Sequence, residues 1–181
     1  IAALSNDSNM INAFKNGEDI HQSTASKVFE IPLNKVTKDQ RNNAKTINFG
    51  IIYGVSAFGL SQQTNLNRSE SKDLIETYYA SYPKLREYID SQVNFARENG
   101  YVSTILGRRR YLKDINSSNA IIRGASERNA VNAPIQGSAA DIIKLAMISI
   151  HKKLSENNWK SKMLLQVHDE LVFDVPKHEL E

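Results

Sequence analysis

The chain has 181 residues, which is long enough to bury a hydrophobic core as one large domain or two small ones. It contains no cysteine, which excludes disulfide bonds and cysteine-ligated zinc, and its longest apolar stretches are far too short for a transmembrane helix. Its net charge of +3 permits nucleic-acid binding but is weak support for it.

Two short helices are predicted near the N-terminus, at 9–14 and 20–29, with Gly17 between them and Pro32 after the second. The second contains His21, which is either a structural side chain, the commoner case for a lone histidine, or part of a site.

A longer helix is predicted over 38–53, because Thr37 and Gln40 form a capping-box pattern and Gly54 follows the last turn. One face is apolar and suited to a core: Ala44, Ile47 and Ile51. Side chains spaced four apart share another face: Arg41, Lys45, Phe49 and Tyr53. Two cations near the positive end of the helix dipole, followed by two rings, match the phosphates, sugar and base of a nucleoside triphosphate. The alternative is an ordinary amphipathic helix with a solvated basic face.

Helices are also predicted at 69–82 and 83–99, the second opened by Pro83 and closed by Gly100. Residues 101–105 and 108–112 predict a β-hairpin with three consecutive arginines. A loop at 116–123 is the one plausible domain boundary.

A helix is predicted from Glu127 to about Leu154, with Pro134 as a break or kink. Its first part carries polar side chains spaced four apart: Arg128, Asn132 and Gln136. Its second part carries an apolar stripe that we expect to approach a sheet: Ala139, Ile142, Ala146 and Ile150. A buried helix with a polar cap explains the spacing equally well.

Residues 163–175 predict a tight β-hairpin whose tip carries His168, Asp169 and Glu170 between apolar flanks. Pattern alone favours a solvated turn. The functional alternative is a divalent-metal site, since Mg²⁺ prefers a few carboxylates together with phosphate oxygens and water.

Three segments together resemble family A DNA polymerases, the bacterial DNA polymerase I type. Residues 41–54 (RNNAKTINFGIIYG) resemble the nucleotide-binding motif of the fingers, and residues 166–173 (QVHDELVF) resemble the palm motif with a metal-binding carboxylate. Residues 127–137 (ERNAVNAPIQG) are similar to the segment that touches the primer end and template. The similarity runs over about residues 1–175, with the three motifs in family order.

The resemblance implies an α+β, mainly helical fold. It implies a helical fingers subdomain over 1–122 and a partial palm over 123–181, in which a β-hairpin packs on a long helix. It also implies a DNA-directed DNA polymerase that adds deoxynucleotides to a primer 3′-hydroxyl with two Mg²⁺ ions. The family association further implies a cytoplasmic protein.

Residue roles are carried over only at matching positions. The implied catalytic residues are Asp169, Glu170 and Lys45, with Asp169 and Glu170 as metal ligands. The implied nucleotide-binding residues are His21, Arg41, Lys45, Phe49 and Tyr53. The implied DNA-binding residues are Arg128, Asn132, Gln136 and His168.

The chain begins with Ile1 rather than methionine, so we expect it to be a piece of a longer polymerase. Residues 1–5 resemble the segment that follows the first palm motif, which holds the second metal-bridging aspartate in the family. We therefore expect the isolated chain to be inactive. Its expected partners are primer–template DNA, deoxynucleoside triphosphates, and the N-terminal palm, thumb and exonuclease-type regions of the same parent. Lys113 departs from the proline that many relatives carry there.

Two other classes remain open. A single-subunit RNA polymerase also has a basic and aromatic fingers helix and a His-Asp palm tip, but Phe49 and Glu170 favour the DNA enzyme. A non-catalytic nucleic-acid-binding module would need only the arginines at 108–110 and Arg128.

Overall fold

The computed structural model describes residues 1–64 and 66–180. Its elements follow one another along the chain as α1 (Ala2–Ser5), α2 (Ser8–Lys15), α3 (Ile20–Val28), η1 (Leu33–Lys35), α4 (Lys38–Ile52), α5 (Ala57–Ser61), α6 (Arg68–Ser81), α7 (Pro83–Asn99), β1 (Tyr101–Ser103), β2 (Arg109–Tyr111), α8 (Ala120–Glu156), β3 (Lys162–Val167), β4 (Glu170–Asp174) and η2 (Lys177–Glu179). The fold is mainly helical with two antiparallel hairpins, β1–β2 and β3–β4, so the predicted fold class is confirmed.

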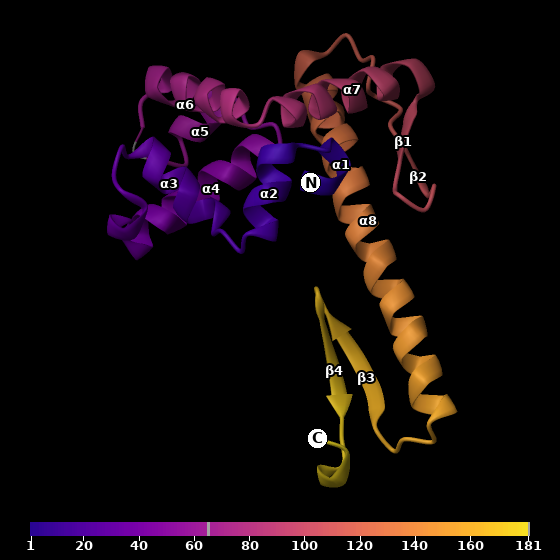
Figure 1. Ribbon diagram of the computed structural model, residues 1–181. Coiled ribbons are helices and arrows are strands. Elements are labelled where there is room, and N and C mark those ends of the chain that lie inside the picture. The colour runs from indigo at the N-terminus through magenta and orange to yellow at the C-terminus, as the bar shows by residue number, and fades with distance from the viewer. Residues whose placement is uncertain (65, 181) are drawn as a thin grey trace.

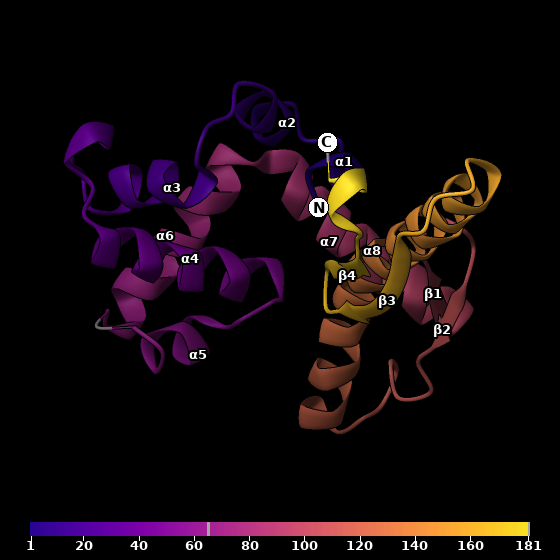
Figure 2. The ribbon, with the colours of Figure 1, turned by 90° about the horizontal axis from the view of Figure 1, so that it is seen from below.

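The molecule consists of a helical body and a long arm (Figure 1). Helices α2 to α6 form the body, and α7 leads from it to α8, which extends away as the arm. The β3–β4 hairpin lies beside the far half of α8 in both ribbon views (Figures 1 and 2). None of the helices in the described residues is long and apolar enough to cross a membrane.

The helical body is built around one hydrophobic core. Its buried members come from α2, α4, α5, α6, α7 and the junction between α6 and α7: Met10, Ile47, Ile51, Leu60, Tyr78, Tyr82 and Leu85. As predicted, the buried face of α4 also includes Ala44. Burying this face fixes the orientation of α4, so its opposite face is presented to solvent.

A second core joins α7, the β1–β2 hairpin and α8. Its buried members are Ala96, Val102, Leu112, Ile115 and Ala130. Gly137 of α8 lies so close to the hairpin that a Cβ atom on it would be 2.6 Å from Thr104 Cγ2. Only glycine therefore permits this approach without a shift of the hairpin.

The long helix differs from the prediction at its start and at Pro134. It begins at Ala120 rather than Glu127, because the Asn119 side chain accepts hydrogen bonds from the amides of Ile121 and Ile122. It continues through Pro134 without a break, although proline has no N–H to donate to the carbonyl of Ala130. The predicted boundary between residues 122 and 123 thus falls inside one helix.

The apolar stripe on α8 is only partly covered by other parts of the chain. Ile142 is 56% exposed, and the neighbouring Leu145 is 52% exposed. The β3–β4 hairpin is a two-stranded sheet with a single turn at its tip, so it is too narrow to shield this face completely. The hairpin does lie beside this half of α8, as expected for a stripe that approaches a sheet, but it leaves Ile142 largely exposed.

Candidate nucleotide and nucleic-acid site

The start of α4 is fixed by the predicted capping box. The Thr37 amide donates to Gln40 Oε1 at 2.9 Å, and the Gln40 amide donates to Thr37 Oγ1 at 3.3 Å. Two of the amides that a helix start leaves unpaired are satisfied in this way. The capping box therefore fixes the start of α4. The spacing of four residues then places Arg41, Lys45, Phe49 and Tyr53 along one side of the helix, opposite its buried face.

The C-terminal half of α4 forms one wall of an open depression of about 690 Å³. Lys45, Phe49 and Tyr53 line it, and Arg128 reaches it from α8. The Phe49 and Tyr53 rings stack with centroids 6.0 Å apart, and Lys45 Nζ lies 5.9 Å from the Phe49 centroid. The depression thus combines two cations with two aromatic rings, a suitable lining for an anion that carries a flat base.

Arg41 does not line this depression, because it is held toward α3. Its Nε donates to Asp19 Oδ2 at 2.6 Å, and Asp19 is also the N-cap that accepts from the amides of His21 and Gln22. Desolvation alone would raise the pKa of Asp19, but Arg41 and the Gln22 and His21 amides hold it below its ordinary value. Part of the Arg41 charge is therefore already neutralised within the chain.

His21 lies beside the stacked rings of Phe49 and Tyr53, and Asn48 contacts its Nδ1. Its Nδ1 is 2.9 Å from Asn48 Nδ2, and its ring centroid is 5.8 Å from that of Phe49. Desolvation, with Arg41 and Lys45, lowers the pKa of His21, against the opposing effect of Asp19. With the Asn48 side-chain amide as the donor to Nδ1, the imidazole proton belongs on Nε2.

Asp19 and Asn48 are residues that sequence reasoning missed. Asp19 had a readable signal, since aspartate directly before a predicted helix is a common N-cap. The sequence signal for Asn48 is its position four residues after Ala44, which puts a polar side chain on the apolar face of the helix. In the structure Asn48 is only 1% exposed. A buried amide among apolar neighbours needs a partner, and here that partner is His21.

The three polar residues on α8 separate into two places. Arg128 joins the depression beside α4, whereas Asn132 and Gln136 line a second depression of about 390 Å³ with the arginines of the β1–β2 hairpin. Asn132 Oδ1 is buried and has no hydrogen-bond partner among the described residues. An unsatisfied buried acceptor beside an open surface is suited to a donor supplied by a ligand.

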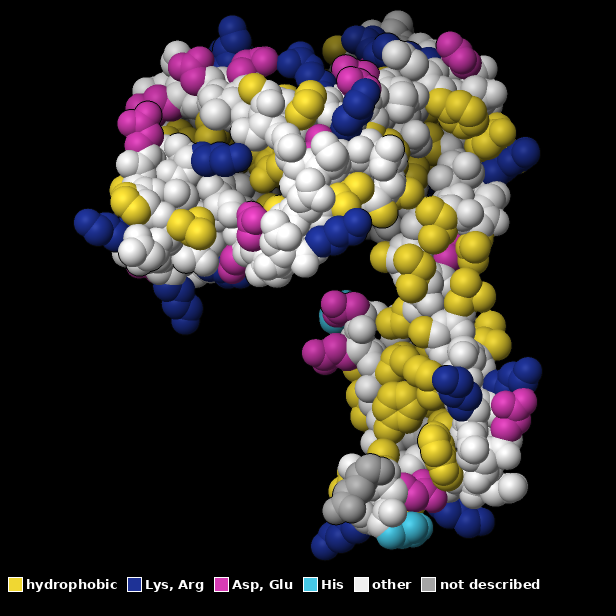
Figure 3. All heavy atoms as spheres, viewed as in Figure 1, with side chains coloured by type: hydrophobic (Ala, Val, Ile, Leu, Met, Phe, Trp, Pro, Cys, Tyr) yellow, Lys and Arg dark blue, Asp and Glu magenta, His cyan; other side chains and the backbone are white. Residues whose placement is uncertain are grey.

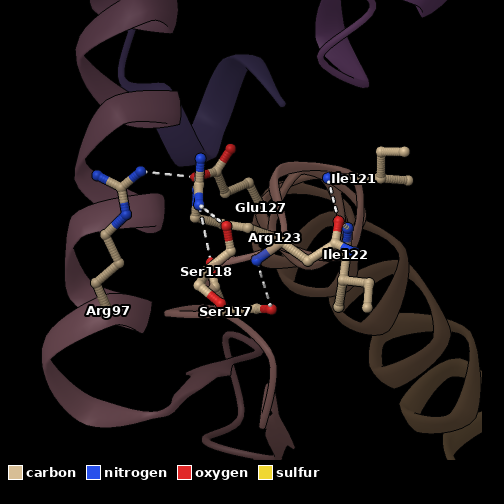
Figure 4. A network of polar contacts seen from close by, with 8 residues as sticks. Arg97, Ser117, Ser118, Ile121, Ile122, Arg123 and Glu127 are labelled. Atoms are coloured by element: carbon tan, nitrogen blue, oxygen red, sulfur yellow. Dashed lines mark hydrogen bonds and ion pairs between the residues drawn. The ribbon is translucent and has the colours of Figure 1, made fainter.

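A polar network fixes the start of α8 against α7 (Figure 4). Arg97 Nη2 donates to Glu127 Oε1 at 2.7 Å, and Arg123 Nη1 donates to the Ser117 carbonyl at 2.8 Å. Arg123 Nε also lies 3.8 Å from Glu127 Oε1. Because Glu127 directly precedes Arg128, the network sets the turn of helix from which Arg128 reaches α4.

The predicted acidic hairpin tip is confirmed as a two-residue turn. Val167 pairs with Glu170, and His168 adopts a left-handed φ of 54° between them. Gln166 Nε2 donates to the His168 carbonyl at 2.7 Å, which braces the turn. His168, Asp169 and Glu170 are exposed, and the tip faces the helical body across a hollow in the surface (Figure 3).

The tip fits part of a metal site. Asp169 and Glu170 supply the hard carboxylate oxygens that Mg²⁺ prefers. Within the part of the chain that the structure describes, no group of three or more His, Cys, Asp or Glu side chains could hold a metal ion. A complete site at the tip thus needs ligands in addition to these two carboxylates.

Comparisons with known proteins agree with this geometry. Residues 1–181 match the model of the family described as DNA polymerase family A. The chain is 51% identical over 179 residues to DNA polymerase I of Caldicellulosiruptor bescii, covering 99% of this chain and 21% of that protein. It is 52% identical over 181 residues to DNA polymerase I of Streptococcus pneumoniae, again covering 99% of this chain and 21% of the relative.

A solved structure also matches. It is described as the POL domain of Pol1 from M. smegmatis in complex with DNA primer-template and dNTP. The TM-score is 0.93 at 47% sequence identity, covering 98% of this chain and 31% of that one. The chain spans about a fifth of the length of the curated relatives it matches. With the family match extending over all 181 residues, the chain belongs to DNA polymerase family A.

Proposed function

We propose that the chain takes part in template-directed DNA synthesis as the fingers and part of the palm of a longer polymerase. The observation that carries the proposal is the depression where Lys45, Phe49 and Tyr53 of α4 meet Arg128 of α8. The M. smegmatis relative, whose described complex contains primer-template and dNTP, supports this assignment.

In the proposed complex, the incoming deoxynucleoside triphosphate lies along α4. Arg41 and Lys45 bind its phosphates, the neutral His21 donates a hydrogen bond to the same group, and Phe49 contacts the sugar. Tyr53 stacks near the templating pair. Arg128, Asn132, Gln136 and His168 contact the primer–template, chiefly through minor-groove acceptors that vary little with sequence.

The proposed reaction is attack of the primer 3′-hydroxyl on the α-phosphate, which releases pyrophosphate. Lys45 is a charged donor at the triphosphate and supplies a proton to the departing pyrophosphate. Asp169, with Glu170 as a less essential neighbour, would hold Mg²⁺. When bound, this ion would offset the negative charge that develops at the reacting phosphate. In this proposal the polymerase acts in the cytoplasm.

The decisive test is Asp169→Asn in the full-length polymerase. Primer extension with Mg²⁺ and four deoxynucleotides should fall by several orders of magnitude, while DNA binding measured by fluorescence anisotropy stays unchanged. Asp174→Asn is the matched control, because Asp174 ends β4 and makes the same charge change away from the turn. Full synthesis by Asp169→Asn would overturn the proposal.

The same assay separates the rival functions. A single-subunit RNA polymerase would extend primers with ribonucleotides in preference to deoxynucleotides. A non-catalytic nucleic-acid-binding module would bind DNA but give no extension in the unaltered protein.

A further inference from the structure

The β1–β2 hairpin places its three consecutive arginines in three different settings. Arg108 is committed to α8: it pairs with Asp141 Oδ1 at 2.6 Å and donates to the Gly137 carbonyl at 3.0 Å. Asp141 is almost fully buried, so this pair anchors the hairpin to the helix. The positive charge of Arg108 is therefore not free to bind another molecule.

Arg109 lies on the outer face of the hairpin. Its guanidinium carbon is 4.4 Å from the centroid of Tyr101, which also contacts the Tyr111 ring at 5.9 Å. Alternation along the strand explains the placement, because Arg109 and Tyr111 project to the same side of β2. Arg109 is thus stacked on the Tyr101 ring on the side of the hairpin away from the core, although part of it also lines the depression that contains Asn132 and Gln136.

Arg110 projects to the other side, toward α8. It is paired in register with Val102, which is fully buried in the second core. Arg110 nevertheless remains exposed, and within residues 1–64 and 66–180 its side chain has no hydrogen-bond or ion-pair partner. An arginine held on a rigid strand without a carboxylate partner retains its full charge for a ligand.

Arg110 also stands between two depressions on this side of the molecule. One, of about 390 Å³, contains Asn132 and Gln136, and the other, of about 500 Å³, contains Lys113 and Asp114. Asn129 of α8 lines both. The positive charge of Arg110 therefore lies directly beside the amides that the proposed function assigns to the DNA minor groove.

We propose that Arg110 binds a backbone phosphate of the DNA strand that passes Asn132 and Gln136. The proposal rests on the proposed function and extends its DNA surface from α8 onto the β1–β2 hairpin. Where the side-chain amides of Asn132 and Gln136 contact a minor-groove edge, phosphates of the same DNA strand lie on either side. Arginine is suited to bind such a phosphate with two parallel hydrogen bonds. Lys113, across the second depression, is positioned to add a weaker contact to the next part of the backbone.

The test is the salt dependence of primer–template binding by the full-length polymerase, measured by fluorescence anisotropy without nucleotide. Each neutralised phosphate contributes about 0.9 to the slope of log K against log salt. Arg110→Gln should lower that slope by about one, and Arg110→Lys should retain it. Arg68→Gln is the matched control, because Arg68 is an exposed arginine that begins α6 of the helical body, whereas Arg110 lies on the β1–β2 hairpin. Figure 1 shows these two elements apart from each other.

An unchanged slope for Arg110→Gln would overturn the proposal, as would an equal loss for Arg68→Gln. The result is independent of the test of function. If Asp169→Asn abolishes synthesis but Arg110→Gln leaves the slope intact, the polymerase function stands and the phosphate contact fails. If Asp169→Asn leaves synthesis intact, the proposed function fails whatever the slope.

Discussion

Arg41 of α4 donates a 2.6 Å hydrogen bond to Asp19, the residue that caps α3. The carboxylate thus joins two helices that are separated in sequence, and it turns Arg41 away from the depression lined by Lys45 and Phe49. We infer that a triphosphate competes with Asp19 for this guanidinium, since both are anionic oxygen ligands.

The Asp19 pair should contribute to stability in a pH-dependent way. Because the folded-state pKa of Asp19 is depressed, its contribution is present above the unfolded value of about 4 and is lost as the pH falls through the folded value. Urea unfolding from pH 6 to pH 2 should show a smaller loss of stability for Asp19→Asn than for the unaltered chain. Asp39→Asn, in the first turn of α4, is the control for the loss of one exposed carboxylate that makes no ion pair with Arg41.

Removing the N-cap of α3 as well as the charge of Asp19 should lower the stability of the protein more than removing the charge alone. Asp19→Ala leaves the His21 and Gln22 amides without their acceptor, so we expect a loss of about 0.5–2 kcal/mol at neutral pH. Asp19→Asn retains an N-cap and should lose less. Equal losses for the two variants would contradict the capping role.

His21 should titrate below the ordinary histidine value of about 6.5. Since the unfolded chain then binds more protons, stability should fall as the pH drops below about 6.5. Nitrogen NMR shifts of the imidazole should show the neutral form with its proton on Nε2. Asn48→Leu should shift the proton toward Nδ1, whereas Asn43→Leu, an exposed change on the same helix, should leave the tautomer as it was.

Gly137→Ala should destabilise the protein although alanine favours helices. The added Cβ would lie 2.6 Å from Thr104 Cγ2, and such overpacking costs about 1–3 kcal/mol. Gly124→Ala is the control in the same helix: its Cβ would meet only Arg128 Nη1, at 3.6 Å, so a gain of up to about 1 kcal/mol is expected. Adding Thr104→Ser removes the clashing methyl and should restore most of the loss in thermal unfolding.

Phe49→Tyr should relax discrimination against dideoxynucleotides in the full-length polymerase. The proposed complex places this ring against the sugar, so a new hydroxyl would come near the 3′ position. Single-turnover incorporation of dideoxy and deoxy nucleotides gives the selectivity ratio directly. Phe58→Tyr, an exposed ring on α5, should leave that ratio unchanged; the same ratio for Phe49→Tyr and the unaltered enzyme would contradict the placement.

Local signals in the sequence were sufficient for most of the fold. The capping box at Thr37, the proline that opens α7 and the glycine that closes it depend on hydrogen bonds within a few residues, so they can be read without the rest of the chain. The sequence places the start of α8 seven residues late, because Ile121 and Ile122 show no helical pattern and Asn119 lies in a stretch typical of a loop. The sequence predicts a break or kink at Pro134, and α8 continues through this residue without a break.

What the sequence determined by itself was the family, the helical spacing of Arg41, Lys45, Phe49 and Tyr53, and an acidic turn between two apolar strands. These features follow from short-range geometry, in which a residue's neighbours along the chain decide its direction. Only the tertiary structure decided that Arg41 pairs with Asp19, that Asn48 holds His21, and that Arg128 meets α4 while Asn132 and Gln136 face the arginine hairpin. Such contacts join residues far apart in the chain, and side-chain packing fixes them only once the two cores have formed.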